Sequence, residues 1–217
     1  MTIPTRPRRR EQDIVDATRV LFDERGMQDV PIDDIARAVG LSRALIYRHF
    51  SSKEELFILT ITRYLAELAG RLEEAAASTG EHVHRLEAIT GTFADFALEY
   101  PAFLDCAISL LRRPHEVLRE QVSDAVWIRL GQGMASCLGV CADVLRDGRD
   151  AGVFTVAEPD YTANHMWSVA LGTMHLARSG VGVSRGPDGT PSAFPVDPIA
   201  VRASAVAAAV AIATARP

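Results

Sequence analysis

The sequence lacks the features that mark secreted or membrane-spanning proteins. Its 217 residues include three cysteines, an odd number without the spacing of a disulfide framework, which fits a reducing cytoplasm. No run of 18 uninterrupted apolar residues occurs, so no membrane span is expected. The basic first ten residues are followed by Glu11 and not by an apolar core, so no secretory signal is expected either. We therefore expect a cytoplasmic protein with no membrane partner.

Motifs for catalysis or for a cofactor are also missing. The sequence contains no G-x-S-x-G turn, no nucleotide-binding glycine pattern and no H-E-x-x-H pair. Cys137 and Cys141 could share one helix face, but no further residue has the spacing that a metal site needs. Buried cysteines acting as small apolar side chains are the better interpretation, and a redox role stays open. The sequence predicts no catalytic residue, no metal and no cofactor, with a helical enzyme as the poorly supported alternative.

Charge is distributed unevenly along the chain. The net charge of −5 looks unfavourable for a nucleic-acid binder. Residues 1–63, however, carry 11 Lys/Arg against 10 Asp/Glu, whereas residues 64–217 carry 12 against 18. Arg6 and Arg8–Arg10 precede any acidic residue. A basic arm on a near-neutral module suits contact with phosphates, and a solvated, disordered tail is an equal alternative.

Apolar spacing predicts two helices at the start of the chain. Apolar residues at i, i+3, i+7 and i+8 over Ile14–Phe22 define the first helix, which Gly26 can end as a left-handed cap. A shorter helix follows over residues 32–39 and ends at Gly40. Pro31 suits its first turn, because a missing N–H costs nothing there.

Two further helices begin at polar caps. Ser42 can cap a third helix over Arg43–Phe50. Ser52 and Glu55 form the S-x-x-E capping box of a fourth helix. Since a Gly-Leu-Ser turn joins the second helix to the third, the sequence predicts a helix-turn-helix at about residues 31–50.

The third helix is predicted to present two different faces. Ile46 and Phe50, four residues apart, point inward and hold the helix on the core. Ala44, Leu45 and Arg48 then point outward, and Arg43 projects from the first turn. Such a face offers the major groove a guanidinium for guanine and small apolar surfaces for a thymine methyl. An ordinary pair of bundle helices, or a helix-turn-helix that binds protein, is the alternative.

Beyond residue 80 the pattern stays helical. The expected helices cover about 82–99, 102–112, 115–147, 160–178 and 198–214. No alternating β pattern of useful length is evident, and Ser179–Pro198, rich in Gly, Pro and Ser, is expected to be a mobile loop. The predicted fold class is therefore all-α, with an N-terminal three-helix DNA-binding module that contains the helix-turn-helix and a larger C-terminal helical domain.

The N-terminal segment, residues 8–68, resembles the TetR (tetracycline-repressor) family of bacterial regulators. The resemblance rests on Ala17, Leu21, Phe22 and Gly26; on Ile35, Ala36, Gly40, Leu41 and Ser42; and on the run from Tyr47 through Phe50 and Lys53 to Leu56. The last run is the most specific, because it joins the recognition helix to the capped start of the next helix.

The resemblance implies a set of DNA-binding residues. Base-edge contacts would come from Arg43, Ala44 and Leu45, and phosphate contacts from Tyr47, His49 and Lys53, the only lysine of the chain. With the cap residue and the basic segment added, the expected set is Arg8, Ser42, Arg43, Ala44, Leu45, Tyr47, His49 and Lys53. Two positions depart from the family pattern: Pro31 stands where Ser or Thr is common, and Ala44 where Gly is common.

The resemblance also implies that residues 69–217 bind an effector and form a dimer. Residues 198–214 are almost wholly small or apolar, so this helix must be buried on most sides. In this family the partner would be a second subunit, giving a homodimer through the two C-terminal helices and a two-fold symmetric DNA operator.

Candidate residues for the effector cavity come from the apolar faces of the middle helices, although plain core is the commoner role of such residues. They are Phe93, Phe96, Phe103, Cys106, Trp127, Met134, Cys137, Trp167 and Met174. Gly131–Cys141 is uncharged and holds three glycines inside a helical region, each costing about 1 kcal/mol relative to Ala. A kink or a close helix approach beside a cavity would explain them and would favour an apolar or aromatic effector. The sequence thus predicts a dimeric transcriptional regulator, most often a repressor in this family, that small-molecule binding releases from DNA.

Overall fold

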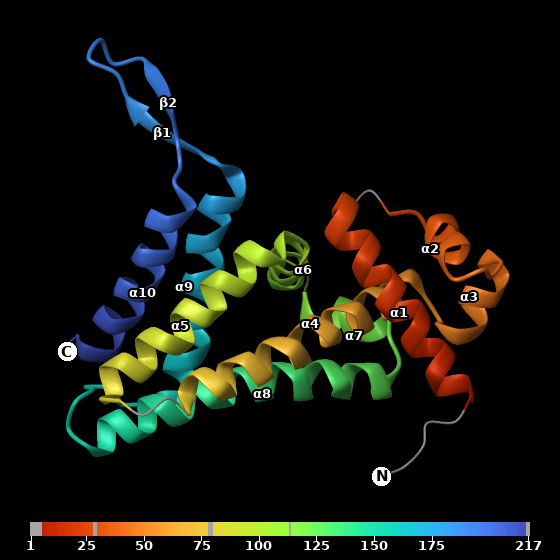
Figure 1. Cartoon of the computed structure of the whole chain (residues 1–217), viewed down its shortest axis with the longest axis horizontal. Helices are drawn as coiled ribbons and strands as arrows, with labels where there is room; N and C mark the ends of the chain where they lie inside the picture. Colours follow the sequence, from red (N-terminus) through yellow and green to blue (C-terminus); the bar gives the residue numbers. More distant parts are fainter. Residues whose placement is uncertain (1–5, 28–29, 78–79, 113, 216–217) are drawn as a thin grey trace. The chain divides into compact units, whose positions relative to one another are not determined.

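The computed structural model describes residues 6–27, 30–77, 80–112 and 114–215, without the side chains of residues 6–8 and 115. These residues form ten helices and one hairpin (Figure 1). The helices are α1 (Arg6–Arg25), α2 (Ile32–Ala38), α3 (Arg43–His49), α4 (Lys53–Ala76), α5 (His82–Glu99), α6 (Pro101–Arg112), α7 (His115–Glu120), α8 (Asp124–Asp150), α9 (Pro159–Ser179) and α10 (Pro198–Thr214). The strands are β1 (Val181–Arg185) and β2 (Pro191–Pro195). The predicted helical fold class is confirmed.

The chain divides into two compact units. Unit 1 comprises Met1–Glu67 and Pro101–Met134, and unit 2 comprises Leu68–Tyr100 and Ala135–Pro217. Unit 1 contains the helix-turn-helix, whereas α5, α9, the hairpin and α10 belong to unit 2. The functional division at residues 8–68 and 69–217 stays a prediction.

The long helix predicted over 115–147 is in fact two helices. α7 ends at Glu120, and α8 begins at Asp124. The Ser52 hydroxyl donates to the Gln121 carbonyl at 2.8 Å, and the Ser123 hydroxyl donates to the Glu55 carboxylate at 2.6 Å. These bonds come from residues almost 70 positions away in the chain, so a local pattern could not predict the break.

The prediction of a mobile loop over Ser179–Pro198 is wrong. β1 and β2 pair antiparallel, with Val181 opposite Pro195 and Arg185 opposite Pro191. Hydrogen bonds to an aspartate and a glycine with positive φ define the turn between the two strands. Asp188 accepts hydrogen bonds from the backbone N–H and the hydroxyl of Thr190, which lower the pKa of Asp188, and Gly189 takes a φ of +85°.

In unit 1, α1 is tied to α4 through a buried aromatic side chain. Tyr64 is fully buried, and its hydroxyl donates to Asp23 at 2.6 Å. The Arg19 guanidinium lies 4.4 Å from the centre of the Tyr64 ring and pairs with Glu67 at 2.6 Å. Burial and the Asp23 carboxylate raise the pKa of Tyr64, so its hydroxyl remains a donor at physiological pH.

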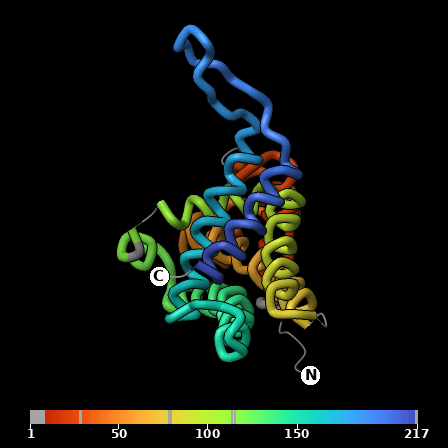
Figure 2. The backbone as a smooth tube through the Cα atoms, turned by 90° about the vertical axis from the view of Figure 1, so that its left-hand side faces the viewer, coloured from red at the N-terminus to blue at the C-terminus, as the bar shows by residue number. Residues whose placement is uncertain are grey.

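In unit 2, α10 packs against α5 and α9 (Figure 2). Arg202 of α10 forms a two-pronged ion pair with Asp95 of α5, at 2.6 and 2.8 Å. A Cβ at Gly91 would lie 2.7 Å from Arg202 Nη2, so a larger residue there would displace the end of the Arg202 side chain. At the other end of α10, the Thr155 N–H donates to the carbonyl of Ala213 at 2.9 Å. Both ends of α10 are therefore fixed within unit 2.

Within the described part of the chain, α8 alone is long and apolar enough to cross a membrane by length and composition. An 18-residue window of α8 has a mean hydropathy of 1.2, and 22% of that window is buried. Core helices of water-soluble proteins pass the same test, so this one helix is weak support for a span.

The start of α4 carries the predicted capping box in a modified form. The Glu55 N–H donates to Ser52 Oγ at 3.0 Å, but the Glu55 carboxylate accepts from the Ser51 N–H at 2.5 Å and not from that of Ser52. Its second oxygen accepts from Ser123. Burial opposes ionisation of Glu55, but the hydrogen bonds from Ser123 and Ser51 outweigh it and hold the pKa of Glu55 below its ordinary value.

This arrangement makes the stability of unit 1 dependent on pH. Because the folded pKa of Glu55 lies below the unfolded value of about 4.3, its stabilisation is present above that pH and is lost as the pH falls through the folded pKa. We expect Glu55→Gln to lower the free energy of unfolding by about 1 kcal/mol at pH 7 and by much less below about pH 4. Urea denaturation at both pH values measures this. Glu54→Gln removes the same charge from the neighbouring position as a control, and equal losses in the two variants would refute the assignment.

Candidate nucleic-acid interface and ligand cavity

The helix-turn-helix is built by α2, a short turn and α3. Ala36 of α2 is buried, and its carbonyl accepts from the Leu41 N–H at 2.8 Å, so a small side chain stands where the turn closes on the helix. Gly40 takes a φ of +65°, a conformation that side chains disfavour. The expected roles of Ala36 and Gly40 therefore match the geometry.

α3 is capped and oriented as the sequence predicts. The Ser42 hydroxyl accepts from the Leu45 N–H at 3.3 Å. Ile46 and Phe50 are both buried, and they fix one face of α3 against unit 1. The opposite face is therefore left for solvent or for a ligand.

The expected DNA-binding residues gather around this outward face. Ser42, Arg43, Ala44, Tyr47 and Lys53 are exposed, whereas Leu45 and His49 are half-buried. Arg48 of α3 is also exposed, as the helical period predicts, although it is not in the expected DNA-binding set.

The basic N-terminal segment is helical. α1 begins at Arg6, so Arg9 and Arg10 project from its first turns and are exposed, and the segment is neither an extended arm nor a tail from that point on. The side chain of Arg8 lies outside the described residues.

The Arg43 side chain makes contacts within its own module. Its guanidinium lies 3.6 Å from the Asp33 carboxylate of α2 and 5.7 Å from the centre of the Tyr47 ring. Both charged side chains are well exposed, so this ion pair contributes at most about 1 kcal/mol and can open. A DNA anion or base that bound Arg43 would have to displace Asp33.

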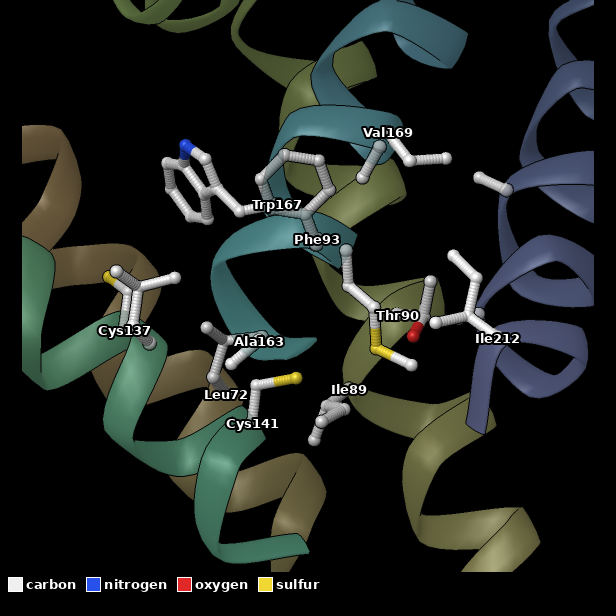
Figure 3. Close-up of a pocket in the computed structure, with 15 residues that line it drawn as sticks. Leu72, Ile89, Thr90, Phe93, Cys137, Cys141, Ala163, Trp167, Val169 and Ile212 are labelled. Atoms are coloured by element: carbon white, nitrogen blue, oxygen red, sulfur yellow. The ribbon is translucent and has the colours of Figure 1, made fainter. Parts of the chain in front are cut away.

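Unit 2 contains an apolar cavity between α4, α5, α8, α9 and α10 (Figure 3). It encloses about 570 Å³ of empty space, including the part open to solvent. It is lined by Leu72, Ile89, Thr90, Phe93, Cys137, Leu138, Cys141, Ala163, Met166, Trp167, Val169, Ala170, Ala205, Ala209 and Ile212. No lining residue is charged.

The predicted and the observed cavity residues overlap only in part. Phe93, Cys137 and Trp167 line the cavity, and the rings of Phe93 and Trp167 meet edge to face at 5.1 Å. Phe96 and Met174 are buried in unit 2 but do not line it. The other candidates, Phe103, Cys106, Trp127 and Met134, belong to unit 1.

The lining residues that the sequence did not single out are mainly aliphatic or small. Leu72, Ile89, Leu138 and Ala163 have no chemical feature that separates them from ordinary core. Cys141 was considered only for redox or metal chemistry, and its helical spacing from Cys137 was the signal that could have placed both on one wall.

The two cavity cysteines are poor nucleophiles. Burial raises the pKa of Cys141 to about 12, and burial together with the charge of Glu73 raises the pKa of Cys137 to about 12. Thiols with such pKa values remain protonated at neutral pH. In Figure 3 the Cys141 sulfur points from α8 toward the interior, where it adds apolar surface.

One of the three glycines of Gly131–Cys141 lies at a close approach between helices. α8 is helical from Asp124 to Asp150 without interruption. A Cβ at Gly133 would lie 3.2 Å from Leu65 of α4, whereas nothing lies within 4 Å of such an atom at Gly131 or Gly139. Of the kink and the close helix approach that the sequence offered as alternatives, the close approach is present at Gly133.

The helix-turn-helix and its flanks match a known family. The family model for "Bacterial regulatory proteins, tetR family" matches residues 14–59, from the first buried position of α1 into α4. This part of the chain belongs to the TetR family. Residues 14–59 are therefore a TetR-type DNA-binding module, the kind found in transcriptional regulators.

Named relatives of this chain match over its N-terminal part. The transcriptional activator FasR of Mycolicibacterium smegmatis is 35% identical over 91 residues, which are 42% of this chain and 41% of FasR. The transcriptional repressor KstR2 of Rhodococcus jostii is 34% identical over 83 residues, 38% of this chain and 41% of KstR2. The chain thus spans less than half the length of these curated relatives.

Solved structures resemble the chain over nearly its whole length. The alignment with PfmR of Thermus thermophilus covers 94% of this chain and 99% of PfmR, with 20% identity and a TM-score of 0.62. That with FadR of Bacillus subtilis, solved in complex with stearoyl-CoA, covers 92% and 97%, with 16% identity and a TM-score of 0.66. These similarities show that the fold is shared.

The Asp33–Arg43 ion pair predicts that removing the charge of Asp33 strengthens DNA binding. We expect Asp33→Asn to tighten binding to a short duplex of random sequence by about two- to fivefold at low salt, because Arg43 is released and a carboxylate is removed. Fluorescence anisotropy with a labelled duplex measures the Kd.

Asp34→Asn provides the matched control. It removes the same charge one residue later, but Asp34 binds Arg25 and Arg37 at 2.7 and 2.9 Å and not Arg43. A larger gain for Asp33→Asn supports the competition, and an equal gain in both variants would count against it.

Proposed function

We propose that this TetR-family regulator is a cytoplasmic, dimeric repressor that leaves a two-fold symmetric operator when a small apolar or aromatic molecule fills the cavity of unit 2. The observation that carries the proposal is the outward face of α3. Its inward residues are buried, its cap is satisfied, and Arg43, Ala44 and Tyr47 are exposed, with Arg43 paired to Asp33 and lying against the Tyr47 ring.

DNA reading is assigned to the module of residues 8–68. In the proposed complex, α3 enters the major groove, Arg43 donates to guanine, and Ala44 and Leu45 contact bases. Tyr47, His49 and Lys53 contact phosphates, and Lys53 is well placed for this at the exposed start of α4, where backbone N–H groups also favour an anion.

Effector binding is assigned to the cavity. Its lining carries no charge, so a ligand must bring an uncharged apolar part, either an alkyl chain or an aromatic ring. Thr90 is the main polar side chain of the lining, but its hydroxyl already donates to the Leu86 carbonyl at 2.8 Å. Since the FadR structure of similar fold contains stearoyl-CoA, acyl chains are a reasonable first class to test.

Dimerisation is assigned to α9 and α10, within the domain of residues 69–217. Val201, Ala205, Ala209 and Ala213 of α10 are buried in unit 2. Beyond Ile199 in the first turn, the opposite face carries mainly small uncharged side chains, which are exposed at Ala200, Ala203, Ser204, Ala207 and Ala211. Small residues allow two helices to approach closely, so this face suits a second subunit.

Selection from a random duplex library tests the DNA assignment. We expect the protein to enrich a two-fold symmetric site, with binding that weakens as salt rises because phosphate contacts release counterions. Arg43→Ala should weaken binding to that site by about 5- to 150-fold, the effect of losing one base contact worth about 1–3 kcal/mol. Arg149→Ala, an exposed arginine of unit 2, should leave the Kd unchanged.

Other outcomes would change the assignment. If a folded dimer enriches no sequence, α3 does not read bases. If the enriched site acts upstream of a reporter gene to raise its expression, the protein is an activator, as FasR is named, and not a repressor.

Filling the cavity tests the effector assignment. The uncharged fluorescent probe N-phenyl-1-naphthylamine should bind the protein, and Ala170→Phe should weaken that binding by at least about tenfold because the ring occupies the cavity. Ala157→Phe places the same ring at an exposed position of unit 2 and should have no effect. Equal probe binding by both variants would mean that the probe binds elsewhere. Stearoyl-CoA, used as a competitor, then tests the acyl class.

A further inference from the structure

The β1–β2 hairpin has one side that is mainly apolar and exposed. In an antiparallel pair, directly opposite residues point to the same side, and successive residues alternate. Val181 pairs with Pro195, Val183 with Ala193 and Arg185 with Pro191, so these side chains share one side, called here the valine side, with the charged Arg185 at its turn end. Val181 is 52% exposed and Val183 is 76% exposed.

On the other side of the hairpin an aromatic ring lies over the opposite strand. Gly182 pairs with Phe194, and a Cβ at Gly182 would lie 2.3 Å from the Phe194 ring. The ring therefore lies over the Gly182 backbone, which is buried. Ser184 and Ser192 complete this side with hydroxyls. Phe194 is still 47% exposed, but its ring has a contact within the hairpin, whereas Val183 is 76% exposed.

The hairpin has little to stabilise it in isolation. Two-stranded hairpins are marginal in water unless a third element covers one face. Here β2 begins and ends with a proline, Pro191 and Pro195, neither of which has an N–H to donate to the ladder. Beyond the strands, the Val196 N–H donates to Gly180 at 3.0 Å and closes the base. A surface that covered the valine side would supply the missing stabilisation.

A second copy of this chain is the occupant that best fits the surroundings. The hairpin continues directly from α9 and α10 and projects beyond their ends in both views (Figures 1 and 2). Beyond Ile199 in its first turn, the exposed face of α10 offers mainly Ala and Ser, each with little apolar area. Stable dimers bury about 800 Å² per subunit and depend on a few large side chains. Val181, Val183 and the 75%-exposed Ile199 supply large side chains next to the alanine face.

We propose that the hairpin is a dimerisation arm, whose valine side packs against the second subunit and extends the interface of α9 and α10. This inference rests on the proposed function, in which α9 and α10 form the dimer. In a two-fold symmetric dimer both arms are used, so one substitution removes two equivalent contacts.

The test compares two neighbouring positions on opposite sides of the hairpin in the full-length protein. Val183→Asp introduces a charge on the valine side, and Ser184→Asp introduces the same charge on the other side. Sedimentation equilibrium measures the dimer Kd. We expect Val183→Asp to raise the Kd by at least about tenfold and Ser184→Asp to change it less than about twofold. Circular dichroism verifies that both variants retain the helical fold.

Photo-crosslinking gives a second readout that does not depend on stability. A benzophenone amino acid at position 183 should crosslink to a second copy of the chain, and the same group at position 184 should not. If the wild type is a dimer but Val183→Asp is equally dimeric, or if position 183 crosslinks only within its own chain, the arm is refuted and the dimer stands. If the wild type is monomeric at about 10 µM, the dimer of the proposed function fails, and the arm fails with it.

Discussion

The buried carboxylate of Glu55 is the constraint on which the arrangement of unit 1 depends. One of its oxygens accepts from Ser51, which precedes α4, and the other accepts from Ser123, which precedes α8. Ser52 adds a bond to the Gln121 carbonyl. A single ionised group thus sets where α4 begins and where α8 begins. Because α3 ends only a few residues before Ser51, the same group also limits where the recognition helix can lie.

Unit 2 is organised by apolar contact and has few charges in its interior. Arg202 and Asp95 fasten α10 to α5 at the surface, and the cavity behind them is lined by aliphatic, aromatic and sulfur-containing side chains. Such a lining offers a ligand contact area but little directional bonding, so shape and volume decide what fits. The family model matches residues 14–59, all of which lie in unit 1. The side chains that line the cavity can therefore differ between proteins that share this arrangement of helices.

How far the sequence predicts the structure depends on whether the signal is local. The Ser42 cap, the 82–99 helix and the inward Ile46 follow from neighbouring residues, and all are as predicted. The break between α7 and α8 follows from distant hydrogen bonds, and the hairpin from a Pro-Asp-Gly turn within a window whose composition suggested a loop. Cavity residues are the hardest case, because Phe93 lines the cavity and Phe96 does not, although both are phenylalanines on one buried helix.

The Asp33–Arg43 pair has a consequence for how a regulator finds its site in a genome. An arginine without an ion-pair partner in its own protein binds any DNA phosphate, which strengthens non-specific binding at millions of other positions in a genome. While the protein is free of DNA, Asp33 forms an ion pair with Arg43. Only an acceptor that binds the guanidinium more strongly than this exposed carboxylate does displaces Asp33. In the proposed role, the N7 and O6 atoms of one guanine together form such an acceptor. In that role the Asp33 carboxylate lowers the affinity for all DNA and shortens the time that the protein spends at non-specific sites.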